Sequence, residues 1–441
     1  GSTLPGVADL PREIADHLAT CEYDPQSFPF DPEAVPALFE ALKAENQLLI
    51  ESSTLADYLP GFKDTRYENG TSVQSETLLA ARENLYLSRG DGEESYLSVV
   101  SLALDGPQEV SAATIAGRPG AVYASPDALY VAVREYAYED GEWYFDDSLA
   151  MAEATVVHKF ALFADPPSAA YVGSGVTKGH VLNQFSMDEH EGFLRMATTT
   201  GRAADPTAHS TLSVFEEREL PSGEVQLQVI GMIDNIARTE DIRSVRFDGE
   251  TGFIVTFKKT DPLFVLDLSR PEDPLITAAL KIPGFSAYIH LMDESHLLTM
   301  GYDADDQGSF AWFQGIQLQI FDVGDLRNPL LIHKEVIGTR GSTSEAALNH
   351  LAFNYFPARD LLALPMTICE RSELPGNTPG GRYGDRMTFS GLLVYRVTVE
   401  EGFEPLGGVP HLTPEIVPSY RSWCSNWWTD ADSVVKRSIF M

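Results

Sequence analysis

Acidic side chains gather in the stretch YDADDQGSF at residues 302–310. Asp303, Asp305 and Asp306 are closed by a glycine, and alternating carboxylates of this kind suit Ca²⁺, which takes about six to eight oxygen ligands. The full EF-hand spacing is absent because Gln314, and no glutamate, stands at the twelfth position. The stretch therefore predicts a calcium site at these three aspartates, and a solvated acidic turn is the alternative.

Polar and ionisable residues form a second set of candidates. The histidines make no metal motif, because there is no HExxH and no histidine-rich tract. Several of these residues nevertheless fall at comparable positions of successive apolar segments. If those segments surround a central channel, the residues would line the channel with polar groups that bind a ligand. The alternative is that they bond to neighbouring backbone and close the channel. The set consists of Asn183, Arg243, His290, His350 and Arg437.

Catalytic motifs are weak by comparison. Asp188 and Glu189 could serve a glycoside hydrolase, whose two carboxylates lie about 5 to 9.5 Å apart, but adjacent residues on one turn usually point apart. GSG at 173–175 lacks the strand-to-helix context of a nucleophile elbow, and neither a P-loop nor a dinucleotide fingerprint is present. A polysaccharide-directed hydrolase with carboxylates at the mouth of a channel remains the alternative function.

The composition excludes several partners. A formal net charge of −34 over 441 residues argues against nucleic acid and against anionic membrane surfaces. No apolar run approaches the ~18–20 residues of a transmembrane helix. The acidity fits an exported, salt-adapted or cation-binding protein with a solvated surface.

A repeat explains where the candidate residues belong. VLDLSRPEDPLI at 265–276 returns as IFDVGDLRNPLL at 320–331, and each is a strand, a turn begun by Asp and closed by Pro, and a second strand. Around them lie units of four β-rich runs with no helical period, which is typical of a β-propeller. A two-sheet sandwich would explain the number of strands but not their repetition in units of four. The units span about 72–116, 121–175, 181–233, 242–284, 286–338 and 349–409, and a seventh begins at 436–440.

The predicted fold is therefore all-β, a propeller of seven blades of four antiparallel strands, with the last blade incomplete in this chain. Residues 1–60 are predicted to form a helical and irregular leader, since helical spacing follows Asp31-Pro32, and residues 61–441 form the propeller. Either leader residues such as NQLLIES at 46–52 complete the seventh blade, or the natural protein continues past Met441. We favour the second.

Several phrases resemble a known family. They include LNQFSMDEHEGFLRMATTTG at 182–201, TDPLFVLDLSRPEDP at 260–274, LQIFDVGDLRNP at 318–329 and VVKRSIFM at 434–441. Residues 120–441 are similar to secreted bacterial and archaeal proteins that have a C-terminal β-propeller distantly related to WD repeats. The resemblance implies a propeller fold and a secreted, periplasmic or cell-surface location, and it implies no activity.

The strand order predicts a functional face. With the first strand of each blade innermost, connections between second and third strands share one face with the links between blades. The long connections all fall there, and loops on rigid scaffolds commonly carry binding residues. They span 134–153, 200–210, 302–314, 367–389 and 411–433. We therefore expect a monomeric binding or scaffolding module that takes a protein, peptide or polysaccharide ligand on this face, with calcium as its candidate cofactor.

The same order places two of the three cysteines together. Cys369 follows the second strand of the sixth unit and Cys424 precedes the first strand of the seventh. A disulfide between them would constrain the unfolded chain by about 4 kcal/mol and would indicate an oxidising compartment. The alternative is two partly buried thiols.

Overall fold

The computed structural model describes residues 35–57, 59–68, 70–79, 82–87, 95–104, 110–118, 120–136, 153–203, 205–257, 261–282, 284–306, 311–370, 384, 386–412 and 435–440. The chain divides into two compact units. The first holds Gly1–Pro119 and Phe160–Tyr171, and the second holds Gly120–Lys159 and Val172–Met441. No helix in the described residues is both long enough and apolar enough to cross a membrane.

A helix and a hairpin open the described part of the first unit. The expected leader helix is present as α2 (Val35–Ser52), whose sequence is rich in the strong helix formers Ala, Leu and Glu. A short η1 (Leu55–Asp57) follows, and then β1 (Gly61–Glu68) pairs antiparallel with β2 (Thr71–Leu78). Because NQLLIES at 46–52 lies within α2, these residues do not supply strands to a seventh blade.

The first predicted repeat unit differs from the expectation. The segment 72–116 was expected to form four antiparallel strands, but β2 pairs with β1 instead. The rest is a three-stranded sheet in the order β3-β5-β4, in which β3 runs parallel to β5. Its elements are η2 (Arg82–Asn84), β3 (Leu85–Leu87), β4 (Tyr96–Leu102) and β5 (Val110–Ala116).

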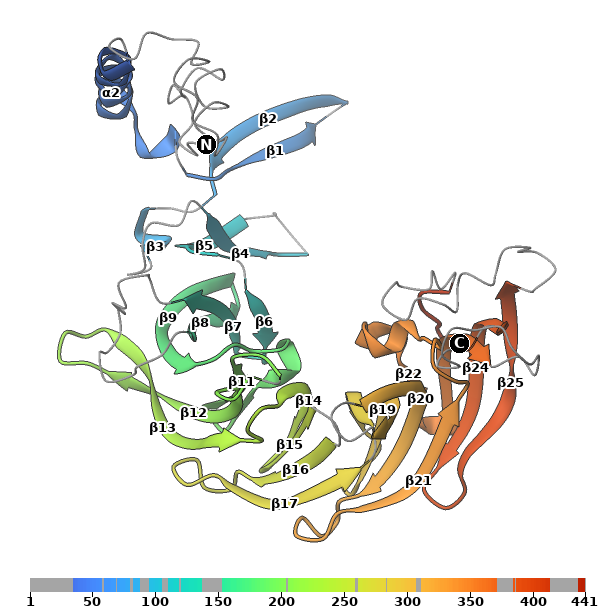
Figure 1. Cartoon of the computed structure of the whole chain (residues 1–441). Helices are drawn as coiled ribbons and strands as arrows, with labels where there is room; N and C mark the ends of the chain where they lie inside the picture. The colour runs from blue at the N-terminus through green and yellow to red at the C-terminus, as the bar shows by residue number, and fades with distance from the viewer. Residues whose placement is uncertain are drawn as a thin grey trace. The chain divides into compact units, whose positions relative to one another are not determined.

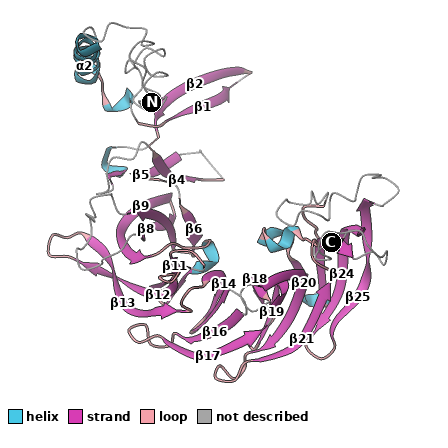
Figure 2. Cartoon of the chain, viewed as in Figure 1, coloured by secondary structure: helices cyan, strands magenta, loops and turns pink. Residues whose placement is uncertain are grey.

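Successive four-stranded runs make up most of the second unit, where strands dominate (Figures 1 and 2), while residues 160–171 of the first run belong to the first unit. Three of these are separate sheets, and two are joined into one eight-stranded sheet where β13 meets β9 in a short parallel pairing. This arrangement confirms the predicted β-propeller. The first two runs are β6 (Ala121–Ala124), β7 (Ala128–Tyr136), β8 (Glu153–Ala164), β9 (Pro167–Lys178), and β10 (Met187–His190), β11 (Phe193–Thr200), β12 (His209–Glu219), β13 (Val225–Ile236).

The separate sheets follow the same up-and-down order. Residues 436–440 lie beside the first strand of the last sheet, where the seventh blade was expected to begin. Asn354 Nδ2 donates to the Ser438 carbonyl oxygen at 2.8 Å, and the Phe440 ring stacks on Phe356. The three sheets are β14 (Asp241–Asp248), β15 (Thr251–Phe257), β16 (Asp261–Asp267), β17 (Leu275–Ile282); β18 (Phe285–Leu291), β19 (His296–Asp306), β20 (Ala311–Asp322), β21 (Leu330–Ile337); and β22 (Asn354–Phe356), β23 (Leu361–Glu370), β24 (Arg386–Thr398), β25 (Gly402–Leu412).

Each sheet in this region buries apolar residues on both faces. In β20, Leu318 and Ile320 pack in one core with Leu364 of the following sheet, whereas Phe321 packs in another with Val265 of the preceding sheet. Because successive strand residues point to opposite faces, an uninterrupted apolar run is what a doubly covered strand requires. The stacking of sheets holds the first strands β14 and β18 side by side.

The repeated aspartates act as turn formers, as the sequence predicted. Asp267 Oδ1 accepts hydrogen bonds from the backbone and hydroxyl of Ser269, and Asp322 Oδ1 accepts one from the backbone of Gly324. The two bonds from Ser269 lower the pKa of Asp267. These aspartates therefore serve the turn between third and fourth strands.

Long connections lie where the strand order was expected to put them. They join second to third strands at β7–β8, β11–β12 and β23–β24. The long loop predicted at 302–314 is wrong, because β19 extends to Asp306 and β20 begins at Ala311, which leaves residues 307–310 as the connection. Residues 137–152, 307–310, 371–383 and 413–434 lie outside the described part of the chain.

Candidate functional site

A cavity of about 400 Å³ lies in the second unit, at the end of the inner strands where the links between sheets enter. Its wall comes from the link before β10, from the first half of β14, from β18, from Tyr302 of β19, and from the link that contains η4 (Glu345–Ala347) and η5 (His350–Ala352). The second-to-third connection of the β18–β21 sheet follows β19 at this same end. The cavity therefore belongs to the face on which ligand binding was expected.

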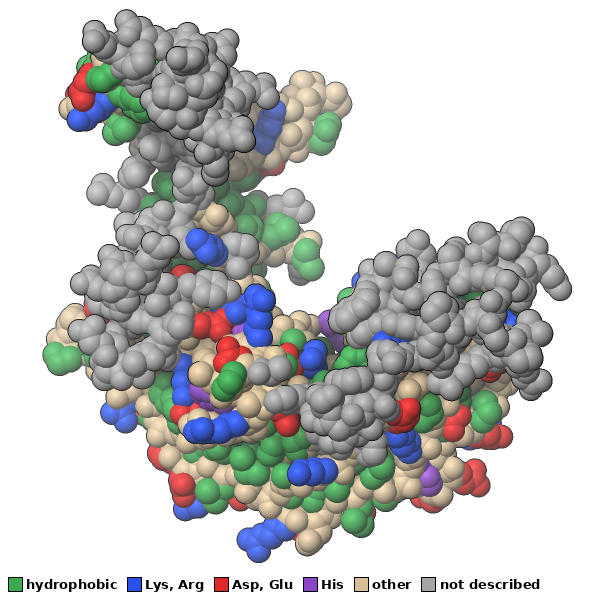
Figure 3. Space-filling view, viewed as in Figure 1, with side chains coloured by type: hydrophobic (Ala, Val, Ile, Leu, Met, Phe, Trp, Pro, Cys, Tyr) green, Lys and Arg blue, Asp and Glu red, His purple; other side chains and the backbone are tan. Residues whose placement is uncertain are grey.

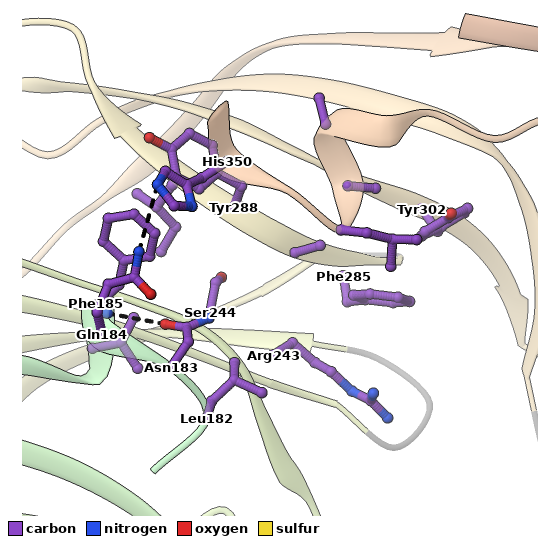
Figure 4. Close-up of a pocket in the computed structure, with 16 residues that line it drawn as sticks. Leu182, Asn183, Gln184, Phe185, Arg243, Ser244, Phe285, Tyr288, Tyr302 and His350 are labelled. Atoms are coloured by element: carbon purple, nitrogen blue, oxygen red, sulfur yellow. Dashed lines mark hydrogen bonds between the residues drawn. The ribbon is translucent and has the colours of Figure 1, made fainter. Parts of the chain in front are cut away.

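One end of the cavity is built around His350 (Figure 4). Asn183 caps the short η3 (Gln184–Ser186), because its Oδ1 accepts a hydrogen bond from the Phe185 backbone at 3.0 Å. Gln184 Nε2 lies 3.5 Å from His350 Nε2, and the Phe185 ring meets the imidazole edge to face with centroids 4.9 Å apart. Tyr288 also contacts Phe185, with ring centroids 5.6 Å apart. This end offers an amide and an imidazole among aromatic rings.

Arg243 occupies the opposite end of the cavity in Figure 4. Its Nη2 lies 3.1 Å from Oδ1 of Asp241, and its Cζ is 5.7 Å from the ring centre of Phe257 and 5.5 Å from that of Phe285. Burial raises the pKa of Asp241, and the charge of Arg243 opposes that shift. The Nε of Arg243 is buried and has no hydrogen-bond partner in the described structure. The guanidinium is thus held in place by Asp241 and two aromatic rings, and these contacts do not use all of its N–H donors.

Three of the five predicted channel residues meet at this cavity: Asn183, Arg243 and His350. Arg243 is on the inner strand β14 as expected. Asn183 and His350 are not on inner strands, as the sequence had suggested, but in the links that precede β10 and β22, within or beside short 3-10 helices. The links bring them to the wall of the same cavity.

The other two predicted channel residues lie elsewhere. His290 is on β18, packed against Tyr288, Phe353 and Tyr355. Burial, and then the charge of Arg246, lower the pKa of His290 to about 4, so its ring is neutral at pH 7. Arg437 is exposed and is not among the described residues that line the cavity.

Aromatic lining residues were missed by the sequence reasoning. Phe185 stands two residues after Asn183 in the same link, and Tyr288 stands two residues before His290 on the same strand. Because residues i and i+2 of a strand share a face, the position of Tyr288 was available from the predicted position of His290. Phe285 and Tyr302 face each other across the β18–β19 pairing and had no such signal.

The predicted calcium residues lie on a strand and not in a loop. Asp303 Oδ1 is 2.5 Å from Lys334 Nζ, and Gln314 Nε2 donates to Asp305 at 2.6 Å. Asp306 ends β19 and pairs with Ala311. Within the described ranges, no group of three or more His, Cys, Asp or Glu residues is placed to hold a metal ion. Calcium binding here stays a prediction.

Asp188 and Glu189 are held in ion pairs on β10. Arg195 binds Asp188, which also accepts a hydrogen bond from the Tyr123 hydroxyl at 3.4 Å. Lys159 Nζ lies 3.1 Å from Glu189 Oε1. Neither carboxylate lines the cavity. An acid–base pair built on these two residues therefore has no support in this arrangement.

Cys369 is fully buried near the end of β23, and its carbonyl oxygen accepts hydrogen bonds from the Thr339 backbone at 2.8 Å and from the Ser342 hydroxyl at 3.2 Å. Cys424 lies outside the described residues. The disulfide between them stays a prediction.

Comparison with known proteins gives relatives in two archaea. The chain is 37% identical over 213 residues to an uncharacterised protein of Archaeoglobus fulgidus, a match that covers 48% of this chain and 30% of that protein. It is 34% identical over 197 residues to an uncharacterised protein of Methanocaldococcus jannaschii, covering 44% and 28%. The chain therefore matches less than a third of the length of either relative.

Among solved structures, the chain is similar to a periplasmic gluconolactonase of Pseudomonas aeruginosa, with 14% identity, a TM-score of 0.36, and coverage of 71% of this chain and 96% of that one. A protein from Lactobacillus plantarum gives 10% identity, a TM-score of 0.38, and coverage of 71% and 82%. At these TM-scores the two likenesses support no statement about function.

A family model described as a beta propeller domain matches residues 33–441. That range includes every four-stranded run of the second unit and the cavity between their inner strands. By this match over most of its length, the chain belongs to the beta propeller domain family.

Proposed function

We propose that this chain is a binding module that takes its ligand, a protein, peptide or polysaccharide, in the cavity at the link face. The observation that carries the proposal is that residues from three separate parts of the chain, Asn183, Arg243 and His350, converge on one cavity of about 400 Å³. A volume of this size, lined by aromatic rings with a few polar groups, is typical of ligand sites. Propellers offer such sites on a rigid scaffold.

Binding is favoured over hydrolysis by the chemistry of the wall. A glycoside hydrolase needs two carboxylates flanking the scissile bond. The 16 described residues that line the cavity include no Asp and no Glu. Asp241 is not one of these lining residues, and its carboxylate is paired with Arg243. The alternative of a polysaccharide hydrolase therefore lacks its acid and base at this cavity.

Blocking the cavity rim tests the proposal. Leu348 lines the cavity and is 74% exposed, so Leu348→Trp should fill the opening at little cost to folding. Labelled wild-type and variant chains are applied to arrays of oligosaccharides and of peptides. We expect Leu348→Trp to lose at least about tenfold in affinity for whichever probe binds the wild type, because the indole occupies the ligand's volume.

Leu351→Trp is the matched control, since Leu351 is 51% exposed on the next short helix and does not line the cavity. Its binding should equal that of the wild type. Equal binding by Leu348→Trp would move the ligand site away from the cavity. Release of reducing ends from a bound oligosaccharide would instead support the hydrolase.

Export, a monomeric state and calcium binding at Asp303, Asp305 and Asp306 belong to the same proposal. The net charge of −34 supports an exported protein with a solvated surface. Thermal unfolding in EDTA and in rising Ca²⁺ tests calcium binding, and the same measurement with and without reductant tests the Cys369–Cys424 disulfide, which would indicate export to an oxidising compartment. A bound ion would raise the midpoint progressively with Ca²⁺ concentration, through a stabilisation of about 2.7 kcal/mol at a hundredfold excess over Kd, and Asp303→Ala would abolish the rise. A bridged Cys369 would make the midpoint fall in reductant, and flat responses would remove both points.

A further inference from the structure

The cavity is rich in hydrogen-bond donors and carries a cation at one end. Arg243 and His350 are the basic residues among its described lining, which includes no Asp and no Glu. The Oδ1 of Asn183 is used by the cap on Phe185, which leaves the amide NH₂ of Asn183 as a donor. In a chain with a net charge of −34, a site with this balance differs from the rest of the surface.

Arg243 is arranged to accept an anion. A guanidinium has five N–H donors in a fixed fork, and the contact with Asp241 uses Nη2. The Arg243 side chain is 36% exposed whereas its Nε is buried, so a ligand would reach the guanidinium through its terminal amino groups. The rings of Phe257 and Phe285 fix the plane of the group, which reduces the entropy lost when a second carboxylate binds. Figure 3 shows basic and acidic side chains interspersed over the visible face of the second unit, so no single-sign patch surrounds the cavity in this view.

The rest of the wall suits a ring that bears hydroxyl groups. Phe185, Tyr288, Phe285 and Tyr302 provide flat apolar faces. Gln184 and His350 can each donate and accept, as hydroxyl groups do. A peptide carboxylate is commonly captured by backbone N–H groups in a nest or along a strand edge. Here the wall includes the side-chain amides of Asn183 and Gln184 and the imidazole of His350, which hydrogen-bond to hydroxyl groups, and this favours a carbohydrate.

Resting on the proposed binding function, we propose that the cavity binds a uronic acid residue of an acidic polysaccharide. Its carboxylate pairs with Arg243, and its ring lies against the aromatic residues between Arg243 and His350. Asp241 competes with the ligand for the guanidinium and so limits affinity.

Isothermal titration with trigalacturonate, and with galactotriose as its neutral counterpart, tests this. We expect the wild type to bind trigalacturonate at least about tenfold more tightly, because the ion pair adds to contacts that both sugars make. Arg243→Gln should abolish this preference by weakening trigalacturonate binding far more than galactotriose binding. Asp241→Asn should tighten trigalacturonate binding by about three- to tenfold, since the competing carboxylate is gone. The two substitutions should therefore change trigalacturonate affinity in opposite directions, and this is not expected of a pair whose role is merely structural.

Arg270→Gln is the control, because Arg270 is 63% exposed and pairs with Asp273 in a turn away from the cavity. If Arg243→Gln fails to fold, Asp241→Asn/Arg243→Gln keeps a neutral pair at the site and should show the same loss of preference. Equal affinity for the two sugars in the wild type would overturn the uronate inference and leave the binding function standing. No binding of either sugar, with binding of an acidic peptide that Leu348→Trp blocks, would also overturn it. Failure of Leu348→Trp to affect any ligand would remove the proposed function itself.

Discussion

Replacement of Lys159 by methionine is expected to lower the free energy of unfolding by about 3 to 5 kcal/mol. Lys159 Nζ lies 3.1 Å from Glu189 Oε1 and 2.6 Å from Glu217 Oε1, and the side chains of Lys159 and Glu189 are 9% and 13% exposed. Removing the ammonium leaves the largely buried Glu189 charge held by the hydroxyl groups of Ser125 and Tyr130. Urea unfolding at pH 7 measures the loss.

The same variant should change the acid side of the stability profile. Burial alone would raise the pKa of Glu189, but the Ser125 hydroxyl and the Lys159 ammonium together hold it below its ordinary value of 4.5. A lowered pKa in the folded state contributes stability that is present above pH 4.5 and is lost as the pH falls through the folded pKa. Without Lys159 the folded pKa rises, so the difference between wild type and variant should shrink as both are taken from pH 7 toward pH 4.

Lys436→Met is the matched control, because Lys436 also pairs with a glutamate, Glu345 at 3.0 Å, but is 59% exposed. An exposed pair of this kind contributes about 0 to 1 kcal/mol. Lys159→Met/Glu189→Gln should recover part of the loss, since no uncompensated charge remains. If Lys159→Met proved no more destabilising than Lys436→Met, the buried ion pair would be irrelevant to stability.

Gly301→Ala is expected to destabilise the chain by about 3 kcal/mol or more and to weaken ligand binding. A Cβ at Gly301 of β19 would overlap the backbone carbonyl of Phe285 on β18, and backbone cannot move aside as the end of a side chain can. The two strands must then separate at the floor of the cavity, where Phe285 and Tyr302 line the wall. Thermal unfolding and titration of the array-selected ligand measure the two effects.

Gly117→Ala serves as the control, because a Cβ there meets nothing within 4 Å. Its stability should stay within about 0.5 kcal/mol of the wild type. An unchanged midpoint for Gly301→Ala would show that β18 and β19 can part at this point without cost, and the cavity would then be adaptable and not preformed.

The fold was largely available from the sequence because its signals are local. Runs such as LFVLDL, with Asp267 and a proline at the following turn, depend on neighbours within a few residues, and an uninterrupted apolar run and turn chemistry determine them. The departure is the segment 72–116. Its β3 pairs in parallel with β5. Parallel strands need a crossover connection, and no turn motif in the sequence predicts one.

The candidate site was decided mostly by tertiary structure. The sequence singled out Asn183, Arg243 and His350 as residue types, but their meeting depends on how links between sheets fold back over the inner strands. Asp303 was predicted to be a calcium ligand. Because β19 and β21 pair on either side of β20 in one sheet, the ammonium of Lys334 lies beside it instead. Local patterns determine where strands begin and end; which side chains become partners depends on register and packing between segments far apart in the chain, and a single sequence does not encode these in any short stretch.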